Sequence, residues 1–314
     1  MKKILLSVAA FLLIFAQSQA EFTEQTCKTW CLKQLEEAYS GANSLEYWYP
    51  AERPQGSFNQ ALLPENHHKN RFPNFALPYD YNLIPSLGER FINASPMKFG
   101  DLSYIAAQGP VKSTMDDFWY MVFMEKCSVI VTVTNTHEVV KGVFHKKFEV
   151  FWPTEKPELF GEILVTPIDD TQLLKEWDDG RKERIFFRTF KLTFGDEELI
   201  VHHIQMENWP DVSVIKPDSL FYLQNLVEKY RQDKTVVIHC AAGVGRTGTL
   251  IAAHSLFHEM QDILAANEIN NEKLNVLKRV HEMRALRYGP MVGAIEQYHL
   301  IIDMLRYALE NERT

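Results

Sequence analysis

The sequence predicts an α/β fold: a single domain with a mixed central β-sheet flanked by helices. Strand-like runs of β-branched and aromatic residues alternate with helical stretches along most of the chain. The 314 residues suffice for one large domain or two small ones, and the 46% hydrophobic content supports a sizeable core. Because the chain shows no internal repeat and no low-complexity segment, we expect one domain.

The individual elements follow from residue type and spacing. Runs rich in β-branched and aromatic residues predict strands at 90–93, 104–107, 129–134, 147–152 and 163–167, then a hairpin of 186–194 and 198–205. Helical stretches are predicted at 23–40, 115–124, 219–232, 248–265, 272–284 and 292–311. The segment 45–70 is rich in Pro, Asn and aromatic residues, which predicts mostly loop.

The first twenty residues have the three parts of a secretory signal peptide. Lys2 and Lys3 form a basic n-region and residues 4–16 an apolar h-region, while Ser18 and Ala20 are the small residues at positions −3 and −1 of a cleavage site. The pattern predicts cleavage after Ala20 and a secreted or periplasmic protein. An uncleaved N-terminal anchor is the alternative, although the apolar run is short for a membrane span.

The expected mature chain, 21–314, is one domain whose first part, 21–66, is a helical and loop extension. Without residues 1–20 the chain has 31 basic and 41 acidic residues, a formal charge of −10. This acidic balance disfavours binding to nucleic acids or anionic membranes. No second apolar run approaches the length of a membrane span, so we expect no span in the mature chain. We also expect a monomer.

The four cysteines have different expected roles. Cys27 and Cys31 are four residues apart in a predicted helix, where either a disulfide or two unpaired thiols is compatible with an exported protein. Cys127 lies beside the predicted strand 129–134 and is expected in the core. Cys240 lies in the segment that carries most of the chemical information.

That segment, 239–249, reads His-Cys-Ala-Ala-Gly-Val-Gly-Arg-Thr-Gly-Thr. Cys240 and Arg246 bracket a five-residue turn between a β-branched run and a helical stretch. In such an arrangement, backbone N–H groups and the helix dipole form a cradle for an anion. The same donors and Arg246 are expected to lower the pKa of the thiol, which is about 8.5 when free. An anion site with a thiolate nucleophile indicates phosphate monoester chemistry through a phosphocysteine.

The string His-Cys-x-x-Gly-x-Gly-Arg-Thr-Gly resembles the signature loop of the cysteine-dependent protein tyrosine phosphatases, and the resemblance spans most of residues 21–314. It implies a highly twisted mixed sheet in one catalytic domain, without cofactor or metal. Cys240 is then the nucleophile and Arg246 binds two phosphate oxygens. Thr247 stabilises the departing thiolate, and His239 orders the loop. The residues implied to hold the phosphate by backbone amides are Ala241, Ala242, Gly243, Val244 and Gly245.

Trp209-Pro210-Asp211 resembles the mobile acid loop of this family. A phenolate leaving group needs a proton as its P–O bond breaks, and a carboxylic acid on a closing loop can supply it, so Asp211 is the expected general acid. Ser213 and Ile215 stand where the family usually has Gly and Pro, and loss of that Gly is expected to restrict the hinge. Lys147 begins a segment resembling the strand after a loop whose Glu and Lys support the acid loop, and Glu138 is the best candidate for that Glu.

Lys69-Asn70-Arg71-Phe72 resembles the loop that recognises phosphotyrosine, in which an aromatic side chain stacks on the substrate ring. Phe72 takes the place of the usual tyrosine, and Asn74 stands where many members have Asp, so both are expected to bind substrate. A long recognition loop makes a deep cleft. Phosphotyrosine reaches the floor of such a cleft and phosphoserine does not, which implies specificity for phosphotyrosine.

The loop that positions water in the family departs more strongly. The family typically has Met-Val-Gln with a second Gln four residues later, whereas this chain has Met291-Val292-Gly293 followed by Gln297. Gly293 can neither hold the attacking water nor block other acceptors. Gln297 is expected to substitute in part, with an exposed helix residue as the alternative. Formation of the phosphocysteine should be intact, and its hydrolysis slower.

His254 and His258 are four residues apart on a predicted helix, a spacing that is compatible with metal binding. The zinc-protease motif would need a catalytic Glu between them, and the intervening residues are Ser-Leu-Phe. Because the family resembled needs no metal, both are expected to be ordinary helix residues.

The leading function is therefore a secreted protein tyrosine phosphatase acting on phosphotyrosine-containing proteins. The short basic n-region is bacterial in type, which would make these the proteins of a host cell and the enzyme a virulence factor. A phosphoinositide phosphatase is a second hypothesis, disfavoured because the variable loop positions Ala241, Ala242 and Val244 are neutral. A third is a pseudophosphatase that binds phosphotyrosine without hydrolysing it, disfavoured because Cys240 and Asp211 are retained with Arg246.

Overall fold

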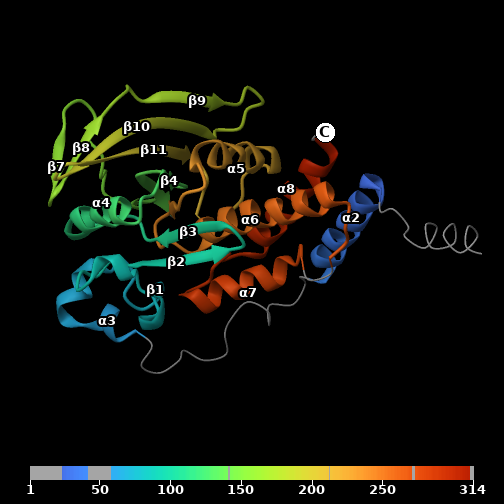
Figure 1. The fold of residues 1–314 in the computed structure, drawn as a ribbon, viewed down its shortest axis with the longest axis horizontal. Coiled ribbons are helices and arrows are strands. Elements are labelled where there is room, and N and C mark those ends of the chain that lie inside the picture. Colours follow the sequence, from blue (N-terminus) through green and yellow to red (C-terminus); the bar gives the residue numbers. More distant parts are fainter. Residues whose placement is uncertain (1–22, 42–57, 141, 212, 271–272, 312–314) are drawn as a thin grey trace, which may run out of the picture.

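The computed structural model describes residues 23–41, 58–140, 142–211, 213–270 and 273–311 (Figure 1). Within these residues the chain forms an α/β domain around a twisted mixed sheet, as the sequence predicts. The expected signal peptide lies outside the described residues. In the part of the chain described, no helix is both long and apolar enough to cross a membrane.

The main sheet has parallel strands at its centre and antiparallel strands at both edges. Its strands lie in the order β2-β3-β12-β4-β11-β10-β8-β7, and β9 also pairs with β10. The pairs β3–β12, β12–β4 and β4–β11 are parallel, whereas β2–β3, β11–β10, β10–β8 and β8–β7 are antiparallel. The bounds are β2 Ala94–Phe99, β3 Leu102–Ala107, β4 Val129–Thr132, β7 Glu158–Phe160, β8 Ile163–Pro167, β9 Gln172–Glu176, β10 Arg184–Phe194, β11 Glu197–Glu207 and β12 Val236–His239.

Two small two-stranded antiparallel sheets are separate from the main one. They are β1 (Leu77–Pro78) with β13 (Arg287–Tyr288), and β5 (His137–Val140) with β6 (Val143–Lys146). The helices are α2 Glu24–Gly41, α3 Asn59–Leu62, α4 Met115–Met124, α5 Pro217–Arg231, α6 Gly245–Ala266, α7 Val276–Leu286 and α8 Ile295–Asn311. Short 3-10 helices are η2 Pro64–Lys69, η3 Asp80–Asn82, η4 Pro85–Leu87 and η5 Lys112–Thr114.

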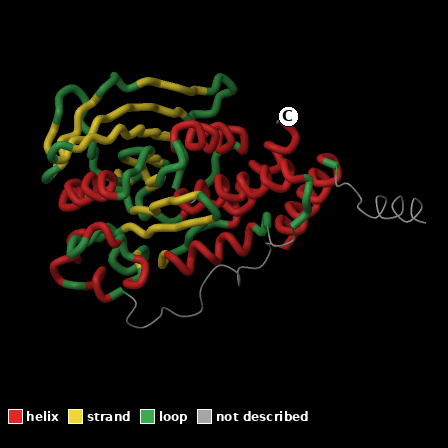
Figure 2. Tube along the Cα trace, viewed as in Figure 1, coloured by secondary structure: helices red, strands yellow, loops and turns green. Residues whose placement is uncertain are grey.

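Helices cover both faces of the sheet, which Figure 2 shows in yellow between red helices. The strand side chains alternate between the two faces. On β12, Val237 packs in a cluster with α4, whereas Val236 and Ile238 pack with α5, α6 and α8. The helix α2 lies against α6 and α8 (Figure 1). All four residues of β12 are fully buried, so the strand that leads into the signature loop is held rigidly from both sides.

Most predicted elements are present, with small shifts of their ends. Two predicted strands are wrong. At 90–93 the chain is irregular, because the Asn93 amide donates to Asn70 and to the carbonyl of Ala76, and the ladder with β3 begins only at Ala94. At 147–152 the chain is irregular, and its buried aromatic side chains pack in the core beside the sheet. The aromatic residues of this segment therefore indicated burial, and the prediction of a strand from them was wrong.

The structure also bears on the expectations for the segment 45–70 and for the cysteines outside the signature loop. Within 45–70, which was expected to be mostly loop, the described part contains α3 and η2. Cys27 and Cys31 are both buried and unpaired on α2, because neighbouring turns of a helix do not meet the geometry of a disulfide. Cys127 is buried in the core, as expected.

Candidate active site

A cavity of about 280 Å³ brings together most of the predicted site residues, from four separate segments of the chain. Its lining consists of Phe72, Phe75, Asp211, Cys240, Ala241, Ala242, Val244, Gly245, Arg246, Pro290, Gly293 and Gln297. The predicted nucleophile Cys240, the predicted acid Asp211 and the predicted water-binding residue Gln297 therefore line one space with Arg246 and Phe72. Asn74 is exposed and is not among the residues that line this cavity.

The signature loop leaves the end of β12 and enters α6 at Gly245, so its backbone amides gather above a helix N-terminus. The N–H of Gly243 donates to Cys240 Sγ over 3.3 Å. Gly243 has φ +73°, and a Cβ at this position would lie 2.1 Å from the carbonyl oxygen of Ala107. Only glycine fits there, which is why the loop can turn its N–H groups toward the sulfur.

Cys240 is buried, and its surroundings favour the thiolate. Burial by itself opposes ionisation, but the charge of Arg246, the hydroxyl of Thr247 and backbone amides outweigh it and lower the pKa of the thiol. The Thr247 hydroxyl is itself buried and has no other hydrogen-bond partner among the described residues. Cys240 therefore has the character of a nucleophile.

Arg246 is 1% exposed and is held by three groups. Its Nη1 donates to Glu138 over 2.5 Å and to the carbonyl oxygen of Trp209 over 2.7 Å, and its Nη2 donates to Asp211 over 3.2 Å. Lys147 contacts both carboxylates, at 3.2 Å from Glu138 and 2.9 Å from Asp211. The assignment of Glu138 as the supporting carboxylate is consistent with these contacts.

Arg287 was missed by the sequence reasoning. It is fully buried beneath the signature loop and donates to the carbonyl oxygens of Gly243 (2.9 Å) and Ala242 (3.0 Å), and to Asn93 (2.7 Å). Burial lowers its pKa to about 9. By binding the loop carbonyls on one side, Arg287 leaves the amides directed to the other. Nothing in its local sequence distinguishes it from a surface arginine.

The side chain of His239 contacts the backbone of the signature loop. Its Nδ1 lies 3.1 Å from the carbonyl oxygen of Cys240, which can only accept, so Nδ1 carries the proton. Burial lowers the pKa of His239 to about 4, so the ring is neutral and Nε2 is an acceptor. The acceptor receives its hydrogen bond from the hydroxyl of Thr132, at 2.7 Å.

This hydrogen-bond chain continues across the sheet through residues that the sequence reasoning did not single out. Because the Thr132 hydroxyl donates to His239, it accepts from Nε2 of His203 at 2.8 Å. The remaining nitrogen of His203, Nδ1, then accepts from Arg188 at 3.4 Å. Burial, with the charge of Arg188, holds the pKa of His203 well below its ordinary value. One directed chain thus runs from β10 through β11, β4 and β12 to the carbonyl of Cys240.

The acid loop is folded over the cavity. Trp209 is 1% exposed, and its Nε1 donates to the carbonyl oxygen of Ser213 over 3.0 Å, which closes the loop on itself. Asp211 is 45% exposed at its side chain, between cavity and solvent. Ile215, in place of the usual proline, is buried in the main core. The loop is therefore anchored at both ends, with the carboxylate at its accessible tip.

Gln297 is 2% exposed, so the alternative of an exposed helix residue is wrong. Its Oε1 accepts from the N–H of Gly293 at 2.9 Å, and its Nε2 donates to the carbonyl of Ser213 at 3.4 Å. The same side chain thus joins the water loop to the acid loop. Val292, which directly precedes Gly293, has φ +60°, a strained conformation for a β-branched residue, and Arg284 donates to its carbonyl oxygen over 3.1 Å.

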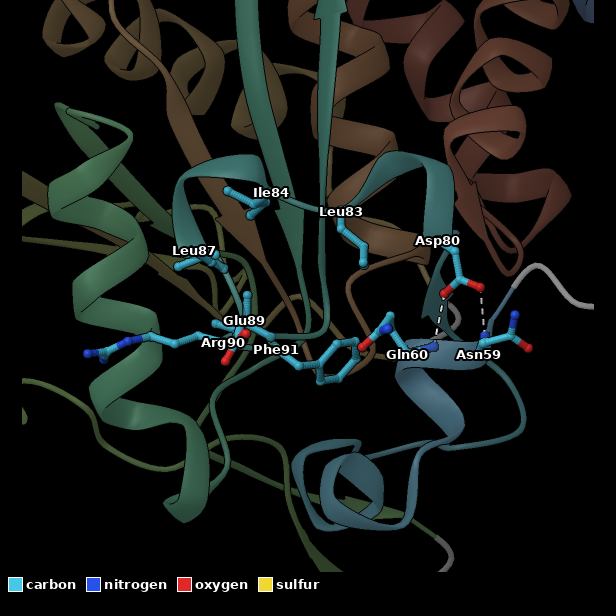
Figure 3. Close-up of a pocket in the computed structure, with 11 residues that line it drawn as sticks. Asn59, Gln60, Asp80, Leu83, Ile84, Leu87, Glu89, Arg90 and Phe91 are labelled. Carbon is cyan, nitrogen blue, oxygen red and sulfur yellow. Dashed lines mark hydrogen bonds between the residues drawn. The ribbon is translucent and has the colours of Figure 1, made fainter.

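A second cavity, of about 510 Å³, lies between α3, η3, η4 and the segment before β2 (Figure 3). Asp80 accepts from the backbone N–H groups of Asn59 (2.7 Å) and Gln60 (3.0 Å), which places a carboxylate at the start of α3. Arg90 pairs with Glu162 at 2.5 Å. Asp80 and Arg90 are thus paired within the fold, and none of the described lining residues belongs to the catalytic cavity.

Thr247→Val is expected to raise the pH at which Cys240 becomes reactive by about one unit, equivalent to about 1.4 kcal/mol of lost thiolate stabilisation. Thr132→Val should shift it in the same direction by less, because it breaks the chain that orders the loop backbone. The pH dependence of inactivation by iodoacetate measures this. Thr249→Val is the control, since that buried hydroxyl donates to the carbonyl of Gly245. An unchanged profile in Thr247→Val would contradict the assignment.

The chain resembles known proteins over most of its length. The sequence profile described as Protein-tyrosine phosphatase matches residues 66–307. The human tyrosine-protein phosphatase non-receptor type 20 is 32% identical over 295 residues, which cover 90% of this chain and 65% of that protein. The human tyrosine-protein phosphatase non-receptor type 12 is 33% identical over 259 residues, 79% of this chain and 31% of that protein. The chain thus spans less than two thirds of the length of these relatives.

A solved structure of PTPN18 in complex with HER2 phosphopeptides has the same fold. It superposes with a TM-score of 0.68 at 25% identity and covers 89% of this chain and 98% of that chain. Since the matching profile spans more than half of the sequence and contains every residue of the catalytic cavity, the chain belongs to the protein-tyrosine phosphatase family.

Proposed function

We propose that this chain hydrolyses phosphotyrosine in proteins through a phosphocysteine intermediate. The observation that carries the proposal is the meeting of Cys240, Arg246 and Asp211 in one cavity, with the thiol activated and the carboxylate at the tip of a loop folded over it. The PTPN18 structure, which holds phosphopeptides of HER2, supports a peptide substrate for this cavity.

In the first step the Cys240 thiolate attacks phosphorus, forming the S–P bond as the P–O bond to the tyrosine breaks. Arg246 has a buried Nε without a hydrogen-bond partner among the described residues, a donor ready for a phosphate oxygen. Its Nη2 would exchange Asp211 for a second oxygen and complete a bidentate contact. The released carboxyl group of Asp211 then protonates the leaving phenolate.

In the second step water attacks the phosphocysteine, with Asp211 accepting its proton. The S–P bond breaks, inorganic phosphate forms, and the returning thiolate is stabilised by the Thr247 hydroxyl and by Arg246. Gln297 is the amide side chain that lines the cavity and the candidate to orient the water. Its carbonyl oxygen must leave the N–H of Gly293 to do so, which adds a cost to this step.

Specificity for tyrosine follows from the walls of the cavity. Phe72 and Phe75 line it together and meet edge to face with ring centroids 6.3 Å apart, an apolar side for an aromatic substrate ring. Among the described lining residues Arg246 is the one cation, so further phosphates find no counter-charge. This composition favours a phosphotyrosine over a polyphosphorylated inositol.

Wild-type protein is expected to hydrolyse a phosphotyrosine peptide in preference to phosphoserine peptides and inositol phosphates, as measured by phosphate release. Cys240→Ser should abolish turnover, and Asp211→Ala should lower kcat by about 10²–10⁴-fold by removing the general acid. A preference for an inositol phosphate would favour the phosphoinositide hypothesis. Tight peptide binding without turnover would favour a pseudophosphatase.

Gly293→Gln is expected to lower the accumulation of phosphoenzyme and the transfer of phosphate to added alcohols, relative to the natural chain. Gly293 has no positive φ, and the nearest neighbour of an added Cβ, the Pro290 carbonyl oxygen, lies 3.4 Å away, so the backbone at this position accepts a Cβ. Burst kinetics with a nitrophenyl phosphate, with and without glycerol, measure both quantities. Equal bursts and equal transfer in the two proteins would sink the proposed role of Gly293.

We further propose that the protein is exported and acts on phosphotyrosine proteins of a host cell. The support for export is the signal-peptide pattern of residues 1–20. An exported phosphatase would meet its phosphotyrosine substrates outside its own cytoplasm, which is the reason for proposing host proteins. Mass spectrometry of protein from the periplasm or medium of an expressing bacterium should find a chain beginning at Glu21. Recovery of the uncut chain in the cytoplasm would contradict export.

A further inference from the structure

The fold places a third potential metal ligand beside the histidine pair of α6. Glu228 on α5 faces His254 and His258, and the ligand atoms of all three lie within 4.8 Å of one another. Nε2 of His258 lies 2.7 Å and Nε2 of His254 3.4 Å from Oε2 of Glu228. The sequence showed only the two histidines, because Glu228 is on a different helix.

A second observation shows that one nitrogen of this cluster is poorly satisfied. His254 is fully buried, and its Nε2 makes no hydrogen bond of good geometry among the described residues, although it lies 3.4 Å from Oε2 of Glu228. Its other nitrogen, Nδ1, is 2.6 Å from the hydroxyl of Tyr104, which orients the ring. A buried imidazole nitrogen without a well-formed hydrogen bond is costly, and a ring held by an outer hydrogen bond is typical of metal ligands.

We propose that Glu228, His254 and His258 bind a zinc ion, with water as the fourth ligand. Two imidazole nitrogens and one carboxylate form a donor set that suits zinc and disfavours calcium and magnesium, which prefer oxygen ligands alone. The three ligand atoms lie within 4.8 Å of one another, close enough to share one ion. The ion would connect α5 to α6 and stabilise the fold, separately from the catalytic cavity, with which the cluster shares no residue.

A neighbouring cation sets the strength of this site. Arg231 Nε donates to Oε2 of Glu228 over 2.6 Å, and its Nη2 donates to Oε1 over 3.3 Å. Zinc must displace Arg231 from Oε2, after which Arg231 keeps its contact to Asp233 at 3.1 Å. Since a positive charge so near repels the metal, replacing Arg231 by a neutral residue should tighten zinc binding. A cluster that is only an ion-pair network would show no such gain.

Calorimetric titration of ZnCl₂ tests the site, in a Cys240→Ser background that removes the zinc-binding thiolate of the catalytic cavity. We expect one equivalent to bind and to raise the thermal unfolding midpoint. His258→Gln should weaken binding by about tenfold or more, because it removes a direct ligand. His281→Gln, at an exposed position on α7, is the matched control and should bind like the parent. Arg231→Gln should bind more tightly.

Equal zinc affinity in His258→Gln and His281→Gln would overturn the proposal, as would weaker binding in Arg231→Gln. Crystals of the unmutated chain soaked in zinc provide a measurement that needs no variant. An anomalous peak at the zinc edge between the three side chains would support the site, and zinc bound only elsewhere would refute it. The proposal stands or falls independently of the phosphatase activity, because neither readout measures turnover.

Discussion

The site depends on the orientation of one stretch of backbone, residues 241–246. Peptide groups are dipoles, so a loop can present its N–H groups to an anion only if its carbonyls point the other way and are satisfied there. Arg287 meets that need from beneath, and Gly243 permits the turn because a side chain would strike the backbone of Ala107. The thiolate of Cys240, the phosphate cradle and the start of α6 all follow from this arrangement.

Arg246 connects the signature loop to the acid loop and to Glu138. A buried guanidinium needs partners, because an unpaired buried charge is costly. Glu138, the carbonyl of Trp209 and Asp211 supply them, and Lys147 balances the two carboxylates. In the proposed reaction a phosphate dianion would compete for the same donors, so binding of the substrate would release the carboxyl group of Asp211 from Arg246. The loop position and the charge in the cavity are therefore linked.

The water loop is where this chain differs most from the pattern it otherwise follows. Gly293 contributes only its backbone, and Gln297 is engaged by it and by Ser213. Arg284 maintains the strained Val292 nearby, so the loop keeps its shape although it lacks one functional side chain. In the proposed mechanism the groups for the first step line one cavity, whereas the second step depends on Gln297, whose side chain is already hydrogen-bonded.

The sequence by itself determined the fold class, the strand-loop-helix signature at 239–249 and the candidate acid at Asp211, since each is written in contiguous residues with a local physical meaning. It misassigned 90–93 and 147–152, where side-chain packing and not residue type decided the backbone. Only the tertiary structure revealed Arg287 beneath the loop, the chain from Arg188 to His239, and Glu228 beside two histidines. These groups act through contacts between distant segments, and a linear pattern carries no signal for what will lie next to a buried charge or imidazole.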